Sequence, residues 1–210
     1  MDLLIFGASG GTGGHLVESA VRRGHTVTAF VRDPSKFATA AVRVVRGDVL
    51  DAPAVRAAIG GQDAVISALG SRTLAPNALL EDASANIVAG MQAEGVRRLI
   101  VLGAAGALRD SGKYQSALTR LGFAFFKATL LRNPLRMQAS QQQTIEASGL
   151  DYTIVLPPRL GDGPRQGAYR ILPDGLPPKG LHLGRADLAE FMLDQLDDRT
   201  FVRATPYVAY

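Results

Sequence analysis

The amino-acid sequence predicts an α/β fold: a doubly wound, mostly parallel sheet with helices on both faces and a small C-terminal lobe. Three observations predict it. Continuous apolar runs, typical of strands buried on both faces, alternate with segments whose apolar residues recur at helical spacing. A glycine-rich segment joins the first run to the first helix. The chain has 210 residues, 47% of them hydrophobic and 20% charged, which suffices for one domain with a sizeable core.

The N-terminal part of the chain predicts one strand–helix–strand unit. Residues 3–6 form an apolar run that ends at Gly7, and residues 7–14 are rich in glycine. A helix follows, with apolar side chains at helical spacing and Gly24 at its end. Residues 26–31 then form the second strand.

The alternation of strands and helices continues to a sixth predicted strand. Further strands are expected at residues 42–45, 64–67, 99–102 and 152–156, and helices at residues 54–59 and 77–94. Because parallel strands need crossover connections of this kind, the repeated pattern predicts a parallel sheet.

Two later segments depart from this alternation. Residues 103–150 are predicted to be a helical insertion of two helices, one before and one after Asn133-Pro134. Residues 157–184 hold six of the eleven prolines and six glycines, so we expect mostly loop there, with a short strand as the alternative. A last helix is expected at residues 188–196, followed by a terminal strand.

Composition excludes several classes of protein. There is no cysteine, which excludes a disulfide framework, a thiolate metal site and a cysteine nucleophile. The three histidines show no ligand spacing, so no metal site is expected. A net charge of +4 does not suggest a nucleic-acid binder, and no apolar run reaches the roughly 18 residues of a membrane span. We therefore expect a cytoplasmic protein that binds neither nucleic acid nor a membrane.

The glycine-rich segment carries a variant of the dinucleotide-binding fingerprint. Gly7, Gly10 and Gly13 follow a buried strand and open an amphipathic helix, which is the context that the fingerprint requires. Glycine permits the tight turn and the close approach of a pyrophosphate, which the free N–H groups of the helix can hold. The predicted cofactor contacts in this Rossmann-type unit are Gly7, Ser9, Gly10, Gly11, Thr12 and Gly13. A tight turn without a ligand is the alternative.

The end of the second strand distinguishes NADP from NAD. Arg32 lies at the tip of this strand and Lys36 four residues on, so two cations stand where a 2′-phosphate would bind. Asp33 keeps the alternative open, because a carboxylate at this place can accept a hydrogen bond from the ribose 2′-hydroxyl of NAD. We expect NADPH as the cofactor.

Two further segments are expected at the cofactor. Asp48 and Val49 follow the third strand, which places them near the adenine, although a turn aspartate is an equally good interpretation of Asp48. Ala68, Leu69 and Gly70 end the fourth strand at the switch in strand order, where small residues leave room for the ribose.

Ten short segments carry a family resemblance that runs nearly end to end. They are residues 6–13, 31–33, 47–50, 61–66, 69–72, 86–88, 148–150, 157–162, 167–169 and 187–192. Together they resemble the atypical short-chain dehydrogenase/reductases of the NAD(P)-binding NmrA-like group. Within this group they are most similar to the branch of biliverdin IXβ reductase, or NADPH-dependent flavin reductase.

The resemblance implies an activity and an organisation. The family reduces flavins, and in some members linear tetrapyrroles, with NADPH. It implies a single domain that acts as a monomer; a homodimer is the alternative. The sequence predicts that this NAD(P)-binding domain spans residues 1–210, with the helical insertion at 103–150 and a substrate region at 157–184. The resemblance also implies that Arg32 and Lys36 meet the 2′-phosphate. The nicotinamide side of the pocket would be lined by Pro157, Pro158, Arg159 and Leu160.

The sequence departs from the family where the chemistry occurs. The family has a serine after the fifth strand, whereas residues 103–106 carry no hydroxyl, and Arg159 stands where the family has histidine. No tyrosine is followed by a lysine four residues later, which argues against the usual short-chain reductase acid. Arg72 and Arg159 are the candidate catalytic residues, because a guanidinium would stabilise charge on the acceptor. Their alternatives are a solvated loop charge for Arg72 and an ion pair with Asp162 for Arg159.

These observations predict an NADPH-dependent reductase that transfers a hydride to a flavin or a similar conjugated acceptor, such as a linear tetrapyrrole. The expected partner is a small aromatic or anionic molecule, and flavin is expected as a substrate rather than a tightly bound group. The first alternative is an NmrA-like redox sensor that binds the dinucleotide without turnover, which the missing serine favours. A sugar-nucleotide epimerase or dehydratase is disfavoured, because that chemistry normally needs the missing tyrosine–lysine pair.

Overall fold

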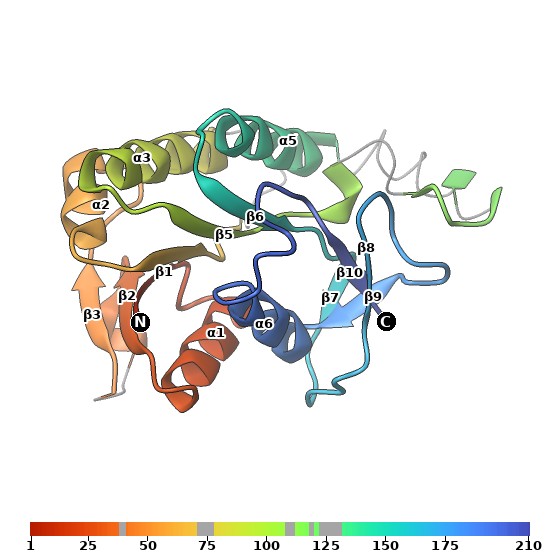
Figure 1. Ribbon diagram of the computed structural model, residues 1–210, viewed down its shortest axis with the longest axis horizontal. Helices are drawn as coiled ribbons and strands as arrows, with labels where there is room; N and C mark the ends of the chain where they lie inside the picture. The colour runs from red at the N-terminus through yellow and green to blue at the C-terminus, as the bar shows by residue number, and fades with distance from the viewer. Residues whose placement is uncertain (38–40, 71–77, 108–111, 118–119, 122–131) are drawn as a thin grey trace.

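Six strands form the central sheet of the computed structural model, which describes residues 1–37, 41–70, 78–107, 112–117, 120–121 and 132–210 (Figure 1). The strands are β1 (Asp2–Phe6), β2 (Thr26–Val31), β3 (Arg43–Arg46), β4 (Ala64–Ser67), β5 (Arg98–Leu102) and β6 (Asp151–Val155). Their order is β3-β2-β1-β4-β5-β6, and every neighbouring pair is parallel. This confirms the predicted doubly wound sheet, whose order reverses between β1 and β4.

Helices cover both faces of this sheet (Figure 1). One face carries α2 (Ala52–Ile59), α3 (Leu79–Glu94) and α5 (Arg132–Glu146), and the other carries α1 (Gly11–Arg22) and α6 (Arg185–Asp194). Alternate side chains of β1 therefore enter different cores. Leu4 and Phe6 pack in the cluster with α2 and α3, whereas Leu3 and Ile5 pack in the cluster with α1 and α6. Burial on both faces explains why the run is continuously apolar.

A buried carboxylate joins α1 to α6. Glu190 of α6 is only 4% exposed; it accepts a hydrogen bond from Ser19 Oγ at 2.8 Å and forms ion pairs with Arg22 and Arg23. Because a buried charge requires such partners, this cluster defines how α6 lies against α1. The first residue of each helix then lies at the candidate site described below.

The C-terminal lobe contains more regular structure than the sequence predicted. β7 (Arg159–Gly161) pairs in parallel with β9 (His182–Gly184), and β8 (Arg170–Leu172) pairs antiparallel with β10 (Tyr207–Ala209). Each strand has three residues, which is too short to show a period of two in the sequence. The abundant prolines and glycines lie mainly between these strands. Their number correctly argued against a helix in residues 157–184, but it gave no sign that short strands pair there.

The second helix expected in residues 103–150 is α5 (Arg132–Glu146), which begins just before Asn133-Pro134 rather than after it. Helix α5 begins at Arg132 and contains both residues in its first turn. Proline is tolerated there because the first N–H groups of a helix have no partner within it. Most of the other helix expected in this insertion lies outside the described residues.

A buried aspartate ties the lobe to α6. Asp187 is fully buried; its two carboxylate oxygens accept hydrogen bonds from the N–H groups of Gln166 and Gly167 at 2.9 and 2.7 Å and from the Tyr210 hydroxyl at 2.5 Å. Burial by itself would raise the pKa of Asp187, but these hydrogen bonds outweigh it and hold the pKa below its ordinary value.

Replacing Asp187 by asparagine is expected to remove a pH-dependent part of the stability. A lowered folded-state pKa means that the ionised carboxylate stabilises the fold fully above about pH 4 and that this contribution is lost as the pH falls further. At pH 7 the variant should lose about 1.5–3 kcal/mol of unfolding free energy. Urea unfolding at pH 7 and pH 3 tests this, because the difference in unfolding free energy between wild type and variant should be smaller at pH 3. An equal difference at the two pH values would contradict the prediction.

Candidate functional site

The glycine-rich turn brings β1 and α1 into backbone contact with β4. Gly7 has a φ of +73°, and a β-carbon added to it would lie 2.6 Å from the Ala68 carbonyl oxygen. A β-carbon on Gly13 would lie 2.0 Å from the Gly7 carbonyl oxygen, and the Gly10 N–H donates to that same oxygen at 2.9 Å. These contacts leave no room for side chains, so the turn exists because the sequence has glycine there.

The start of α1 is suited to an anion. Its N-cap, Gly10, offers no side-chain hydrogen bond, and the first turn carries no acidic residue. The first N–H groups of the helix therefore have no capping side chain, and the helix dipole adds positive potential. Ser9 is exposed beside them, whereas Thr12 is buried and only 6% exposed. A pyrophosphate fits this arrangement.

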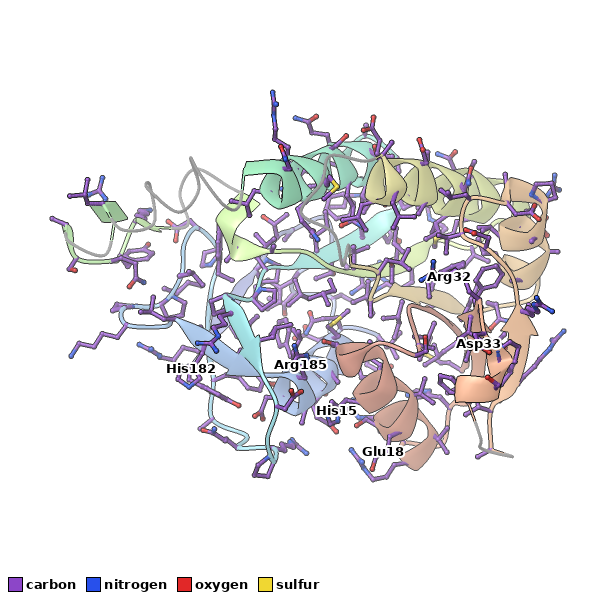
Figure 2. All side chains as sticks on the ribbon, turned by 180° about the vertical axis from the view of Figure 1, so that it is seen from behind. His15, Glu18, Arg32, Asp33, His182 and Arg185 are labelled. Atoms are coloured by element: carbon purple, nitrogen blue, oxygen red, sulfur yellow. The ribbon has the colours of Figure 1, made fainter. Side chains whose placement is uncertain are left out.

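Directly after β2 the chain carries an exposed cation, Arg32, and a carboxylate, Asp33, that already accepts hydrogen bonds. Arg32 is exposed directly after β2, and among the described residues it has no hydrogen-bond or ion-pair partner. Asp33 caps the short 3-10 helix η1 (Pro34–Lys36) by accepting from the Ser35 N–H at 3.1 Å and the Ser35 hydroxyl at 2.6 Å. The side chain of Lys36 lies outside the described residues. Figure 2 shows Arg32 and Asp33 on the same side of the molecule.

The turn after β3 is built by its own polar groups. Asp48 is exposed and accepts a hydrogen bond from the Leu50 N–H at 3.0 Å, as a turn aspartate does. The Val49 side chain is buried in the core, and its carbonyl oxygen accepts from Asn86 Nδ2 at 3.0 Å. These contacts place both residues beside the end of β3 and leave the second carboxylate oxygen of Asp48 available to a ligand.

The segments that follow β4 and β5 carry mostly small side chains. The Ala68 N–H donates to the Phe6 carbonyl oxygen at 3.0 Å, and Leu69 and Gly70 follow at the carboxyl edge of the sheet. After β5, Ala105 is buried and donates its N–H to Pro157. Arg72 lies outside the described residues.

Side chains of the segment after β6 differ in burial: some lie in the core and others are exposed. Pro157 is buried, Pro158 is half-buried, and Leu160 packs on the core between the sheet and α6. Arg159 is exposed and lies opposite His182 in the pairing of β7 with β9. The alternative ion pair of Arg159 with Asp162 is not found, because Asp162 pairs with Arg185 at 2.7 Å.

Arg185 is a site residue that sequence reasoning missed. It is the first residue of α6, yet its side chain lies against Gly11, the first residue of α1 (Figure 2). No local pattern marks this contact, because the two residues meet only through the packing of the two helices.

A pocket of about 460 Å³ borders the fingerprint on the side of β2 and β3. It is lined by Ala8, Ser9, Gly10, Gly14, Val17, Glu18, Val21, Phe37, Ala41 and Val42. Most of these side chains are apolar, so the pocket adds apolar room next to the anion site.

The described residues contain neither a cluster of metal-ligand side chains nor a membrane-spanning helix. No group of three histidine, aspartate or glutamate side chains there is arranged to hold a metal ion. None of the helices there is long and apolar enough to cross a lipid bilayer.

Comparison with known proteins gives one family match. Residues 7–199 match the family model described as NAD(P)H-binding. YwnB, an uncharacterized protein of Bacillus subtilis (strain 168), is 30% identical over 202 residues, which are 94% of this chain and 92% of YwnB. An uncharacterized chloroplastic protein of Arabidopsis thaliana, At2g34460, is 28% identical over 183 residues, or 82% of this chain. The match spans only 64% of that relative's length.

Solved structures match over the whole chain. SP1627 of Streptococcus pneumoniae TIGR4, a proposed NADH-flavin reductase, is 25% identical with a TM-score of 0.82, covering 100% of this chain and 99% of that one. ChuY of Escherichia coli O157:H7, an anaerobilin reductase, is 24% identical with a TM-score of 0.79, and the match covers 100% of this chain and 97% of ChuY. At its level of identity ChuY shows the shared fold alone.

Proposed function

Since the chain belongs to the NAD(P)H-binding family, we propose that it is an NADPH-dependent reductase that transfers a hydride to a flavin or a similar conjugated acceptor, such as a linear tetrapyrrole. One observation carries the proposal: a glycine cradle too tight for side chains lies on the same sheet edge as Arg32, while the neighbouring Asp33 is engaged in a cap. The cradle supports a pyrophosphate, and Arg32 supports a 2′-phosphate.

The chain's own residues would bind and orient the cofactor. The start of α1 would hold the pyrophosphate, Arg32 would form charge-assisted hydrogen bonds to the 2′-phosphate, and Pro157 and Pro158 would wall the nicotinamide side. NADPH, when bound, supplies the hydride.

On the acceptor side the chain contributes charge rather than a side-chain acid. Residues 103–106 hold no hydroxyl, and Arg159 is exposed at the start of β7. A guanidinium there would stabilise the negative charge that a conjugated acceptor gains on reduction, with water supplying the proton. The similarity to SP1627 supports flavins as the acceptors to test first, and the family resemblance adds linear tetrapyrroles.

A redox sensor of the NmrA-like type is the second candidate. The observation that favours it is the stretch of glycine and alanine after β5, where no hydroxyl could polarise a substrate. A sensor needs the glycine cradle and Arg32 as much as a reductase does, so dinucleotide binding alone does not separate the two candidates.

Oxidation of NADPH in the presence of an acceptor separates them. With FMN, riboflavin and biliverdin supplied in turn, we expect turnover at least tenfold above the enzyme-free rate for one acceptor, and slower turnover with NADH. Fluorescence titration of NADPH, run in parallel, reports binding without turnover. NADPH binding without NADPH oxidation in any mixture would favour the sensor. If the chain neither binds nor oxidises NADPH, both candidate functions are overturned.

A further inference from the structure

Arg185 occupies the space that a side chain on Gly11 would need. A β-carbon added to Gly11 would lie 2.9 Å from Arg185 Nε and 3.0 Å from its Cδ. Gly11 is the first residue of α1 and Arg185 the first of α6, so the guanidinium lies beside the N–H groups that form the anion site (Figure 2).

The hydrogen-bonding capacity of this guanidinium is only partly used. Nη1 donates to Asp162 Oδ1 at 2.7 Å. Within the part of the chain that the structure describes, Nε and Nη2 make no hydrogen bond. An arginine has five N–H donors in a fixed plane, so donors remain for an anion while Asp162 orients the group.

Its ion pair with Asp162 does not by itself account for the position of Arg185. The Asp162 side chain is 83% exposed, and ion pairs with so exposed a partner contribute little to stability. The Arg185 side chain is only 27% exposed and lies against the backbone of Gly11, in the space that a side chain on Gly11 would fill. An anion at the start of α1 would give the remaining donors a charged acceptor.

Arg185 approaches the anion site from the side opposite to Arg32. Arg32 follows β2, which lies on one side of β1 in the sheet. Arg185 directly follows β9, which pairs with β7, the strand next to the prolines expected on the nicotinamide side. The two arginines therefore face different halves of a dinucleotide that lies across this edge.

We propose that Arg185 binds the nicotinamide-side phosphate of the cofactor's pyrophosphate and so positions that half of the cofactor. This inference rests on the proposed dinucleotide binding and adds a residue to it. Nη1 stays paired with Asp162, and the Nε and Nη2 donors, which make no hydrogen bond among the described residues, meet the phosphate.

Binding of whole and partial cofactors to purified variants tests this inference. NADPH, NADH and 2′,5′-ADP, which lacks the nicotinamide-side phosphate, are titrated by calorimetry against the wild type, Arg185→Ala and Arg185→Gln. Both variants are expected to bind NADPH and NADH about tenfold more weakly, by similar factors, and 2′,5′-ADP less than twofold more weakly. Arg199→Ala is the matched control, because Arg199 forms an exposed pair with Asp151 at the start of β6, at the opposite edge of the sheet.

The outcomes are distinguishable. Unchanged dinucleotide affinity in both Arg185 variants, or an equal loss for 2′,5′-ADP, would overturn the role of Arg185 while leaving the proposed function intact. A wild-type chain that binds neither dinucleotide would overturn the proposed function and this inference with it. Thermal unfolding of each variant excludes loss of the fold as the cause.

Discussion

Replacing Arg32 by alanine is expected to weaken NADPH binding about 10- to 100-fold and NADH binding less than twofold. Charge-assisted hydrogen bonds contribute about 1.5–3 kcal/mol, and only NADPH carries the 2′-phosphate that Arg32 would bind. Arg32 is exposed and has no partner among the described residues, so its loss should leave the fold intact. Titration of both dinucleotides against the folded variant measures the difference.

Asp33→Ala is the reciprocal variant. If Asp33 serves as the cap of η1, its replacement should leave the affinity for NADH within about threefold of wild type. A selective loss of NADH affinity in Asp33→Ala, or an equal loss of both cofactors in Arg32→Ala, would show that the chain distinguishes the cofactors in another way.

Gly13→Ala is expected to abolish cofactor binding and to destabilise the fold by about 3 kcal/mol or more. The added β-carbon would lie 2.0 Å from the Gly7 carbonyl oxygen, so the backbone of the turn must move. Urea unfolding measures the loss of stability, and NADPH titration below the unfolding transition measures binding.

Gly14→Ala is the matched control at the next position of the same helix. A β-carbon there has no neighbour within 4 Å, and alanine is favoured over glycine in a helix by about 0.5–1 kcal/mol. This variant should therefore be slightly more stable than the wild type. Similar losses in both variants would mean that the helix start, rather than the close approach at Gly13, is the sensitive feature.

The two arginines of the site can be separated by these experiments. Arg32 should select between NADPH and NADH, because the cofactors differ only at the 2′-position. Arg185 should affect both equally, because both contain the pyrophosphate. A selective loss of NADPH affinity in Arg32→Ala, together with an equal loss of both affinities in Arg185→Ala, would assign the 2′-phosphate to Arg32 and the pyrophosphate to Arg185 without a bound structure.

The local sequence pattern was sufficient to predict most strands of the sheet. The strand expected at residues 64–67 is β4 itself, because a strand buried on both faces is a continuous apolar run with abrupt ends. The turn from β1 to α1 followed from glycine spacing, since backbone freedom is a property of the residues themselves. For the segment that holds β7 and β9 the sequence favoured loop, with a short strand only as the alternative, because pairing rather than periodicity defines strands of three residues.

By itself the sequence determined the fold class, the glycine turn and the cation at the end of β2, because each depends on residues adjacent along the chain. The tertiary structure alone decided that Asp162 pairs with Arg185 rather than Arg159, and that Arg185 lies against Gly11. Those contacts depend on how α6 packs on α1 around Glu190, and such packing joins residues that have no relation along the chain.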